Sequence, residues 1–292
     1  MRKINKLFIL VALLTSNLSN AEGIKKEKKA SSDIELLSPT SIFKPLLGDP
    51  KWPRFSLAYY YYTKGAFKYQ TIAPNFGAAL PLVRWKGEDN AQKYELGLHA
   101  GLFATMDVQS SPTRLINADY FIGPTLALKN DRWDYLFRIA HTSSHLGDEL
   151  LLSADGTQRN IKRINLSYET AEVIAGYNFP SGFRPFAGVG YIFHADPNYY
   201  KSAELIAGFD YRHPEYYLNG YAKPVFAIYS KTTHNFKWNP NLSIKTGLEF
   251  KDKFVIGKEL QVLLEYYYGN SIHGQFYNTK ESYVGISLNL NF

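Results

Sequence analysis

The chain has 292 residues, a formal net charge of +7 and no cysteine. The absence of cysteine excludes disulfides, thiol catalysis and cysteine-based metal sites, and the mild positive charge indicates no nucleic-acid partner. Aromatic residues are abundant, with 23 Tyr and 19 Phe, whereas no stretch has the roughly 20 apolar residues that a membrane-spanning helix needs. This composition is typical of an exported protein built from alternating β-strands.

The N-terminal residues 1–21 have the pattern of a secretory signal peptide. A basic start precedes a short apolar core over residues 7–14, and a small-residue cleavage site ends at Ala21. Residues 22–53 are then expected to form a periplasmic N-terminal segment. Its apolar, proline-flanked part around residues 43–47 is predicted to pack under the following domain or to plug it.

Twelve segments with alternating polar and apolar residues follow, each with roughly the ten residues that a tilted strand needs to cross a bilayer. They cover residues 54–63, 71–85, 93–105, 117–128, 132–144, 163–177, 183–195, 201–211, 220–230, 241–251, 259–269 and 282–292. We therefore predict that residues 54–292 form an all-β protein, a transmembrane antiparallel β-barrel of about 12 strands of the outer-membrane type. A secreted β-sandwich is the alternative.

The last segment ends on an aromatic residue, Phe292, and carries apolar residues at every second position from Val284 onwards. This ending resembles the recognition signal of Gram-negative outer-membrane barrels. The resemblance implies that the barrel-assembly machinery is a partner, that the protein resides in the outer membrane, and that outer-membrane lipids surround it.

Charged residues recur on one face of several predicted strands, and we expect that face to line the lumen. The predicted lumen network consists of Arg138, Glu169, Asp210, Arg212, Lys245, Glu249 and Glu265. In a narrow barrel these side chains are expected to pair across the lumen as structural filling rather than to line a wide aqueous channel.

The fifth predicted strand carries polar residues on its apolar face. From Trp133 to Ile139 every second residue is aromatic or aliphatic, and His141, Ser143 and His145 continue the same parity. Two residues along a strand span about 6.6 Å, a gap that an imidazole can largely close. His141 is therefore a candidate general base and Ser143 a candidate nucleophile for an acyl ester.

The His-Thr-Ser sequence near the outer rim of a barrel of this size resembles the catalytic core of outer-membrane phospholipase A, and that of the smaller barrel that removes an acyl chain from lipid A. The resemblance implies a lipid-facing acyl hydrolase. Those families continue with Asn and a small residue, where this chain has Ser144 and His145. Their third, orienting residue lies on the next strand. Here that strand offers Asn165 and Glu169, both expected on the inward parity, while Asn160 lies in the loop.

A second resemblance covers more of the chain. The sequence FKPLLGDPKWPR at residues 43–54 and the sequence HTSSHLGDE at residues 141–149 together resemble a family of exported bacterial proteins known only as a domain of unknown function. This resemblance implies no particular activity.

Two other interpretations of the same run stay open. His145, Asp148 and Glu149, grouped around Gly147, offer ligands for a divalent cation such as calcium, although their spacing matches no standard loop. The polar residues also suit the rim of a barrel, where lipid gives way to headgroups. The sequence thus leaves a lipid hydrolase and a non-enzymatic barrel, either a narrow pore or a structural surface protein, as the two functional hypotheses.

Overall fold

The computed structural model describes residues 34–65, 69–87, 91–151, 163–251 and 259–291. The predicted signal peptide, Asn160 and Phe292 lie outside these residues. Residues 34–292 form one compact unit, and the description below concerns that unit alone.

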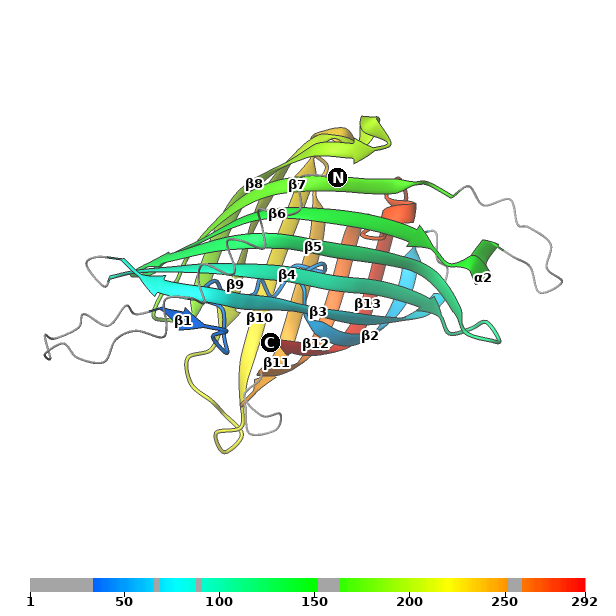
Figure 1. Cartoon of the computed structure of the whole chain (residues 1–292). Coiled ribbons are helices and arrows are strands. Elements are labelled where there is room, and N and C mark those ends of the chain that lie inside the picture. Colours follow the sequence, from blue (N-terminus) through cyan, green and yellow to red (C-terminus); the bar gives the residue numbers. More distant parts are fainter. Residues whose placement is uncertain (1–33, 66–68, 88–90, 152–162, 252–258, 292) are drawn as a thin grey trace, which may run out of the picture. The chain divides into compact units, whose positions relative to one another are not determined.

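Strands β2 to β13 close into an antiparallel barrel (Figure 1). Their bounds are β2 Phe55–Lys64, β3 Tyr69–Lys86, β4 Gln92–Asp107, β5 Arg114–Asn130, β6 Trp133–Leu146, β7 Leu166–Tyr177, β8 Phe183–Asp196, β9 Ser202–Arg212, β10 Ala222–Thr233, β11 Asn241–Phe250, β12 Glu259–Asn270 and β13 Lys280–Asn291. Each strand pairs with the next, and β13 pairs with β2, which closes the sheet. The prediction of an all-β barrel of about 12 strands is confirmed.

The remaining elements are short. A two-residue strand, β1 (Glu35–Leu36), pairs with β3, and a four-residue helix, α2 (Asp148–Leu151), follows β6. Three 3₁₀ turns lie between strands: η1 (Asn198–Tyr200), η2 (His234–Phe236) and η3 (Gly274–Phe276). In the described part of the chain, no helix is long and apolar enough to cross a membrane.

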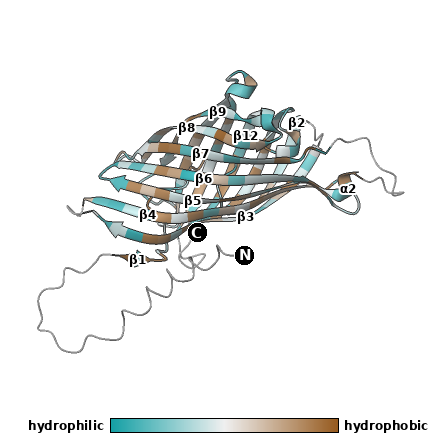
Figure 2. Ribbon diagram, turned by 45° about the horizontal axis from the view of Figure 1, so that its top comes forward, coloured by the Kyte–Doolittle hydropathy of each residue, from teal (hydrophilic) through white to brown (hydrophobic). Residues whose placement is uncertain are grey.

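Alternation along the strands gives the barrel two different faces. Hydrophobic and hydrophilic residues follow one another along the strands (Figure 2). Large apolar side chains are exposed on the outside, as at Phe137 and Ile139, and charged side chains such as Arg138 point into the lumen between them. An outward apolar band with a polar interior is the pattern of membrane barrels. We call the end where β2 begins and β13 ends proximal, and the opposite end distal.

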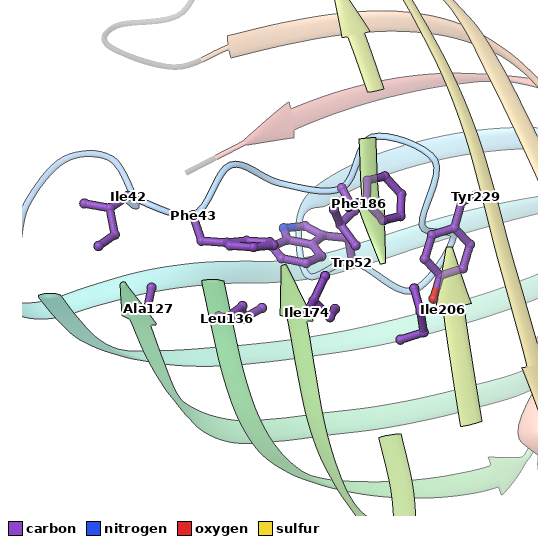
Figure 3. Packing of buried hydrophobic residues seen from close by; sticks show 10 residues of the cluster. Ile42, Phe43, Trp52, Ala127, Leu136, Ile174, Phe186, Ile206 and Tyr229 are labelled. Carbon is purple, nitrogen blue, oxygen red and sulfur yellow. The ribbon is translucent and has the colours of Figure 1, made fainter. Parts of the chain in front are cut away.

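Residues 41–54 occupy the proximal half of the lumen, and we call them the plug. Phe43, Leu46 and Trp52 are almost fully buried, and the rings of Phe43 and Trp52 stack with centroids 5.9 Å apart. They pack against an apolar patch on the inner wall (Figure 3), which comprises Ala127, Leu136, Ile174, Phe186, Ile206 and Tyr229. The inner wall therefore offers the plug an apolar patch for its side chains.

Lumen charges bind the backbone of the plug. The carboxylate of Glu95 accepts a hydrogen bond from the N–H of Ile42, with 3.2 Å to Oε2, and Arg212 donates to the carbonyl oxygen of Pro45 at 3.1 Å. Arg54, the last residue of the plug, donates back to the carbonyl oxygen of Leu46 at 2.9 Å. These bonds satisfy backbone groups that burial removes from water.

The loop between β12 and β13, residues 271–279, folds over the distal mouth, and we call it the cap. Gln275 donates through Nε2 to the carbonyl oxygen of Ser144 at 2.8 Å, and the N–H of Gly274 donates to Oδ2 of Asp119 at 3.2 Å. His273 lies 2.9 Å from the Tyr62 hydroxyl through Nε2. A cavity of about 170 Å³ remains between this cap and the plug.

Candidate functional site

The distal end of β6 carries His141, Ser143 and His145 on the outer face of the barrel. The same strand directs the buried Ser144 into the lumen, where its hydroxyl donates to Oδ1 of Asn117 at 3.3 Å. The outward parity that Trp133 and Phe137 establish thus continues to the rim, because β6 stays in regular register with β5 up to Leu146.

Ser143 is paired with an imidazole. Its Oγ lies 2.9 Å from Nε2 of His145, within hydrogen-bond distance. The His145 ring packs edge-on against Tyr120, with centroids 5.4 Å apart, and Tyr120 is the residue opposite Ser143 on β5. The hydrogen bond expected between His141 and Ser143 is not formed, so Ser143 pairs with the histidine two residues after it rather than with the one two residues before it.

His141 is held by a carboxylate from the next strand. Its Nδ1 lies 2.9 Å from Oε1 of Glu169, the residue directly opposite it on β7. The other oxygen, Oε2, lies 2.5 Å from Nδ1 of His194 on β8. Glu169 therefore links two imidazoles across three neighbouring strands, and the His141 side chain stays 42% exposed.

The prediction that Glu169 lines the lumen is wrong. Tyr168, Thr170 and Glu172 face inward on β7, and Glu169 faces outward with His141. The sequence pattern misleads here because Ile174, on the inner face of β7, is apolar and packs against the plug. Polarity therefore does not distinguish the inner face of β7 from its outer face. The inward carboxylate is Glu172, which accepts from Nε of Arg138 at 2.8 Å.

His194 joins the site through an irregularity in β8. The register between β7 and β8 shifts after Glu169, which pairs with His194, while Thr170 pairs with Ile192. This β-bulge at Phe193 turns His194 to the outside, although the strict alternation of the strand would direct it inward. Bulges commonly re-aim a side chain in this way next to functional sites.

The other candidate accessory and metal residues lie apart from Ser143 and His145. The expected inward direction of Asn165 is also wrong, because this residue is exposed on the distal rim and donates to Oδ2 of Asp196 at 2.8 Å. Asn160 lies outside the described residues. Asp148 and Glu149 are exposed in the first turn of α2. Across the described ranges, no group of three or more His, Asp or Glu side chains is arranged to hold a metal ion.

The remaining predicted lumen residues lie inside and pair with one another. Lys245 and Glu265 approach to 3.2 Å, and Arg212 lies 3.4 Å from Glu249 and 3.6 Å from Asp210. Lys231 on β10 forms ion pairs with Glu172 and Glu204, at 3.5 Å and 2.8 Å. These pairs stabilise the lumen and are separated from the outer site by the barrel wall.

The outer cluster combines groups that acyl transfer requires. It has a hydroxyl in contact with one imidazole, that of His145, and a second imidazole, that of His141, oriented by a carboxylate. In an activated serine of the triad type both features belong to the same imidazole, so the cluster has the groups of a triad divided between two histidines. The residues around it on the wall are apolar or aromatic, among them the exposed Tyr120, Ile122 and Ile139. The arrangement can thus activate a nucleophile at an apolar surface.

Comparison with protein families gives a match to a family model described as protein of unknown function (DUF1207), over residues 15–292. None of the curated proteins compared with the chain matches its sequence.

Comparison with solved structures gives membrane barrels. The outer membrane phospholipase A of Escherichia coli is 15% identical with a TM-score of 0.50, and the match covers 82% of this chain and 94% of that chain. The outer membrane phospholipase dimer of Salmonella typhi with bound calcium is 13% identical with a TM-score of 0.53, over 83% and 93%. The β-domain of the Bordetella autotransporter BrkA is 11% identical with a TM-score of 0.47, over 82% and 98%. At these identities the likeness to the two phospholipases shows an outer-membrane-type barrel fold.

Proposed function

The chain belongs to the DUF1207 family of proteins of unknown function, and we propose that this member is an outer-membrane serine hydrolase that cleaves acyl esters of membrane lipids. The observation that carries the proposal is the 2.9 Å contact between Ser143 Oγ and His145 Nε2 on the outer face of the barrel. The fold is shared with phospholipase barrels, and the choice of reaction rests on these residues.

The position of the site supports a lipid substrate. The distal end of the barrel is the extracellular end if both ends of the barrel domain are periplasmic, as in outer-membrane barrels with an even number of strands. Ionisable groups facing the bilayer are costly and are usually retained for function. Ser143 faces outward beside His141, His145 and Glu169. In this proposal it meets the ester groups of lipids at the depth of the headgroups.

In the proposed reaction Ser143 attacks the ester carbonyl carbon while its proton passes to Nε2 of His145. The tetrahedral intermediate then expels the alkoxide of the lipid, which takes that proton from His145 and leaves as an alcohol. The acyl group remains on Ser143 as an ester. Water next gives a proton to His145 and attacks the acyl carbon, and Ser143 leaves with the proton as the fatty acid departs.

His141 has a second role in this proposal. Glu169 holds its Nδ1 at 2.9 Å, which fixes the ring and directs its opposite edge away from β7. A hydrogen-bond donor at that edge stabilises negative charge on the carbonyl oxygen in the transition state. Glu169 is then a positioning residue that acts through His141.

The lumen gives little support to the alternative of a narrow pore. The plug fills the proximal half with Phe43, Leu46 and Trp52, each at most 1% exposed, and the cap covers the distal mouth. A structural surface barrel would have the same closed lumen but would not need the outer cluster, so the activity of the cluster separates the two hypotheses.

The test is mass spectrometry of lipids incubated with the refolded barrel in detergent or nanodiscs. Phosphatidylethanolamine and lipopolysaccharide are supplied separately. Each is incubated with and without calcium, which tests whether hydrolysis requires this cation. We expect the wild type to release fatty acid and Ser143→Ala to release none. Ser144→Ala is the matched control, since it removes the next hydroxyl of the same strand on the lumen side.

Equal release by wild type and Ser143→Ala, or no release by a barrel shown to be folded, contradicts the proposal. Retention of a covalent acyl group on the Ser143 peptide in a rapidly quenched wild-type reaction would add direct support for the acyl-enzyme.

A further inference from the structure

A groove of about 520 Å³ crosses the outer face of the barrel and ends at His141. It begins at Phe55 on β2 and Phe76 on β3, whose rings meet edge-on with centroids 6.1 Å apart. From there it passes over Ala78 and Ala100 to the candidate site. Its lining is apolar except for the hydroxyl of Tyr120 and the imidazole of His141.

The strand register explains why the groove is straight. Ala78 on β3 is opposite Ala100 on β4, Ala100 is opposite Ile122 on β5, and Ile122 is opposite His141 on β6. The four residues therefore lie in one row across four neighbouring strands. Methyl side chains at Ala78 and Ala100 leave the floor low.

A neighbouring row of larger residues forms a wall of the groove and leads to the nucleophile. Phe76 is opposite Leu102, Leu102 is opposite Tyr120, and Tyr120 is opposite Ser143. Phe76 and Tyr120 are 55% and 51% exposed, so they stand out from the barrel surface. The floor row thus ends at His141 and the wall row ends at Ser143.

The groove also descends into the wall. His141 lies near the distal end of β6, whereas Ala78 lies at the middle of β3. Three strand spacings of about 4.8 Å separate β3 from β6, so the row spans roughly 14 Å across the strands. Because the strands of a membrane barrel tilt by about 35–45°, roughly 8–10 Å of that span lies along the membrane normal.

We propose that this groove binds one acyl chain of a glycerophospholipid, with the ester at Ser143 and the chain end towards Ala78 and Phe76. The inference rests on the proposed function, because it takes the groove to be the substrate channel of the same site. A single chain lying over Ala78 and Ala100 places its ester between the imidazoles at the distal end of the groove.

Charges beside the groove favour a zwitterionic glycerophospholipid over lipid A. Glu169 lies between His141 and His194, and Asp196 is opposite Ser167, which is itself opposite Ser143. Both oxygens of Glu169 already contact histidines, so Asp196 is the carboxylate on the headgroup side that suits a lipid with an ammonium group and disfavours the two phosphates of lipid A. Phosphatidylethanolamine is therefore the expected ligand.

Occupancy of the groove is tested with Ser143→Ala protein, which has no nucleophile. The protein is placed in nanodiscs of phosphatidylethanolamine in which a fraction of the lipid carries a diazirine in its acyl chain. After illumination the labelled peptides are mapped by mass spectrometry. We expect labelling to concentrate on the β4 and β5 segments around Ala100 and Ile122.

Ala100→Phe, added to the Ser143→Ala protein, should lower that labelling at least fivefold, because the ring fills the floor from a lipid-facing position that the barrel tolerates. Ala187→Phe is the matched control, since Ala187 is an exposed alanine on β8, away from the groove. Labelling spread evenly around the barrel, or unaffected by Ala100→Phe, overturns the proposal. Displacement of the label by lipopolysaccharide but not by added phosphatidylethanolamine overturns the choice of phospholipid.

Hydrolysis distinguishes failure of the groove from failure of the proposed function. In an otherwise wild-type chain, Ala100→Phe should lower kcat/KM about tenfold for a long-chain ester and at most about twofold for a short-chain ester, which does not reach Ala100. Equal rates on long-chain esters with and without Ala100→Phe would exclude the groove and keep the hydrolase. Groove-specific labelling of a barrel that cleaves nothing would keep lipid binding and exclude the hydrolase.

Discussion

The backbone N–H of Leu47 donates a hydrogen bond to Oδ1 of Asp210 at 3.0 Å. The other oxygen of the same carboxylate lies 3.2 Å from Nη1 of Arg184. A single fully buried carboxylate therefore accepts a hydrogen bond from the plug backbone and balances the charge of a buried arginine in the barrel wall.

Replacing Asp210 with alanine should strongly destabilise the barrel, because the change leaves both the Leu47 N–H and the Arg184 charge without this partner. Breaking a buried charge pair costs about 3–5 kcal/mol. The loss is measured as the fall in the free energy of unfolding in denaturant, followed by circular dichroism. Glu215→Ala, at an exposed loop position, is the control, and equal stabilities of the two variants would contradict the structural role of Asp210.

Trp52→Ala should loosen the plug. Trp52 is 1% exposed and contacts both the Phe43 ring and His99, whose ring centroid is 5.1 Å away. Truncating a buried tryptophan costs about 3–5 kcal/mol, and the barrel should then pass ions in planar bilayers where the wild type does not. Trp52→Phe keeps a ring in the same place and should be closer to wild type in both measurements. A conducting wild type would show that the plug does not block the lumen.

Stability should fall in acid because of His273, which lies in the cap outside the strands. Burial, together with the nearby charge of Lys51, lowers the pKa of His273 to about 3, whereas an unfolded histidine has a pKa near 6.5. Between these values the unfolded chain binds one more proton than the folded chain, so acid favours unfolding. The free energy of unfolding should therefore be about 2–3 kcal/mol lower at pH 4.5 than at pH 7 from this group.

His273→Gln isolates that contribution, because glutamine can still bond Tyr62 and Thr105 but does not titrate. The variant should lose less stability than the wild type over the same pH range. Parallel pH curves for the two proteins would assign the acid sensitivity to other groups.

The two imidazoles beside Ser143 should differ in their effects on hydrolysis. His145→Gln removes the base in contact with Ser143 and should lower kcat at least a hundredfold, since general bases contribute about 10²–10⁴. Glu169→Gln should lower kcat by about tenfold to a hundredfold and shift the pH profile, because it acts through His141. A larger loss in Glu169→Gln than in His145→Gln would identify His141 as the base.

The sequence was sufficient to predict the strands and the closed barrel. Segments such as residues 132–144 and 183–195 show the period of two for about ten residues, and the structure has β6 and β8 within two residues of those bounds. The outward direction of His141 and Ser143 followed from the same parity. Local alternation therefore predicted both the fold and the face that carries the site.

Three features of the outer site could not be predicted from alternation: the direction of Glu169, the position of His194 and the partner of Ser143. The outward direction of Glu169 could not be derived, because the inner face of β7 is adapted to the plug, and the plug is far away in the sequence. His194 reaches the site only through the bulge at Phe193, which no local pattern indicates. The preference of Ser143 for His145 over His141 is a choice between rotamers on one strand, which alternation leaves undetermined.

The plug also constrains the order of biogenesis. It continues without a linker into β2, and Arg54 at the junction reaches back to the carbonyl oxygens of Leu46 and Asp49. The barrel closes where β2 pairs with β13. If the plug were still outside when these two strands pair, it would have to be threaded into a closed barrel. We therefore expect β2 and β13 to pair around a plug that is already in place.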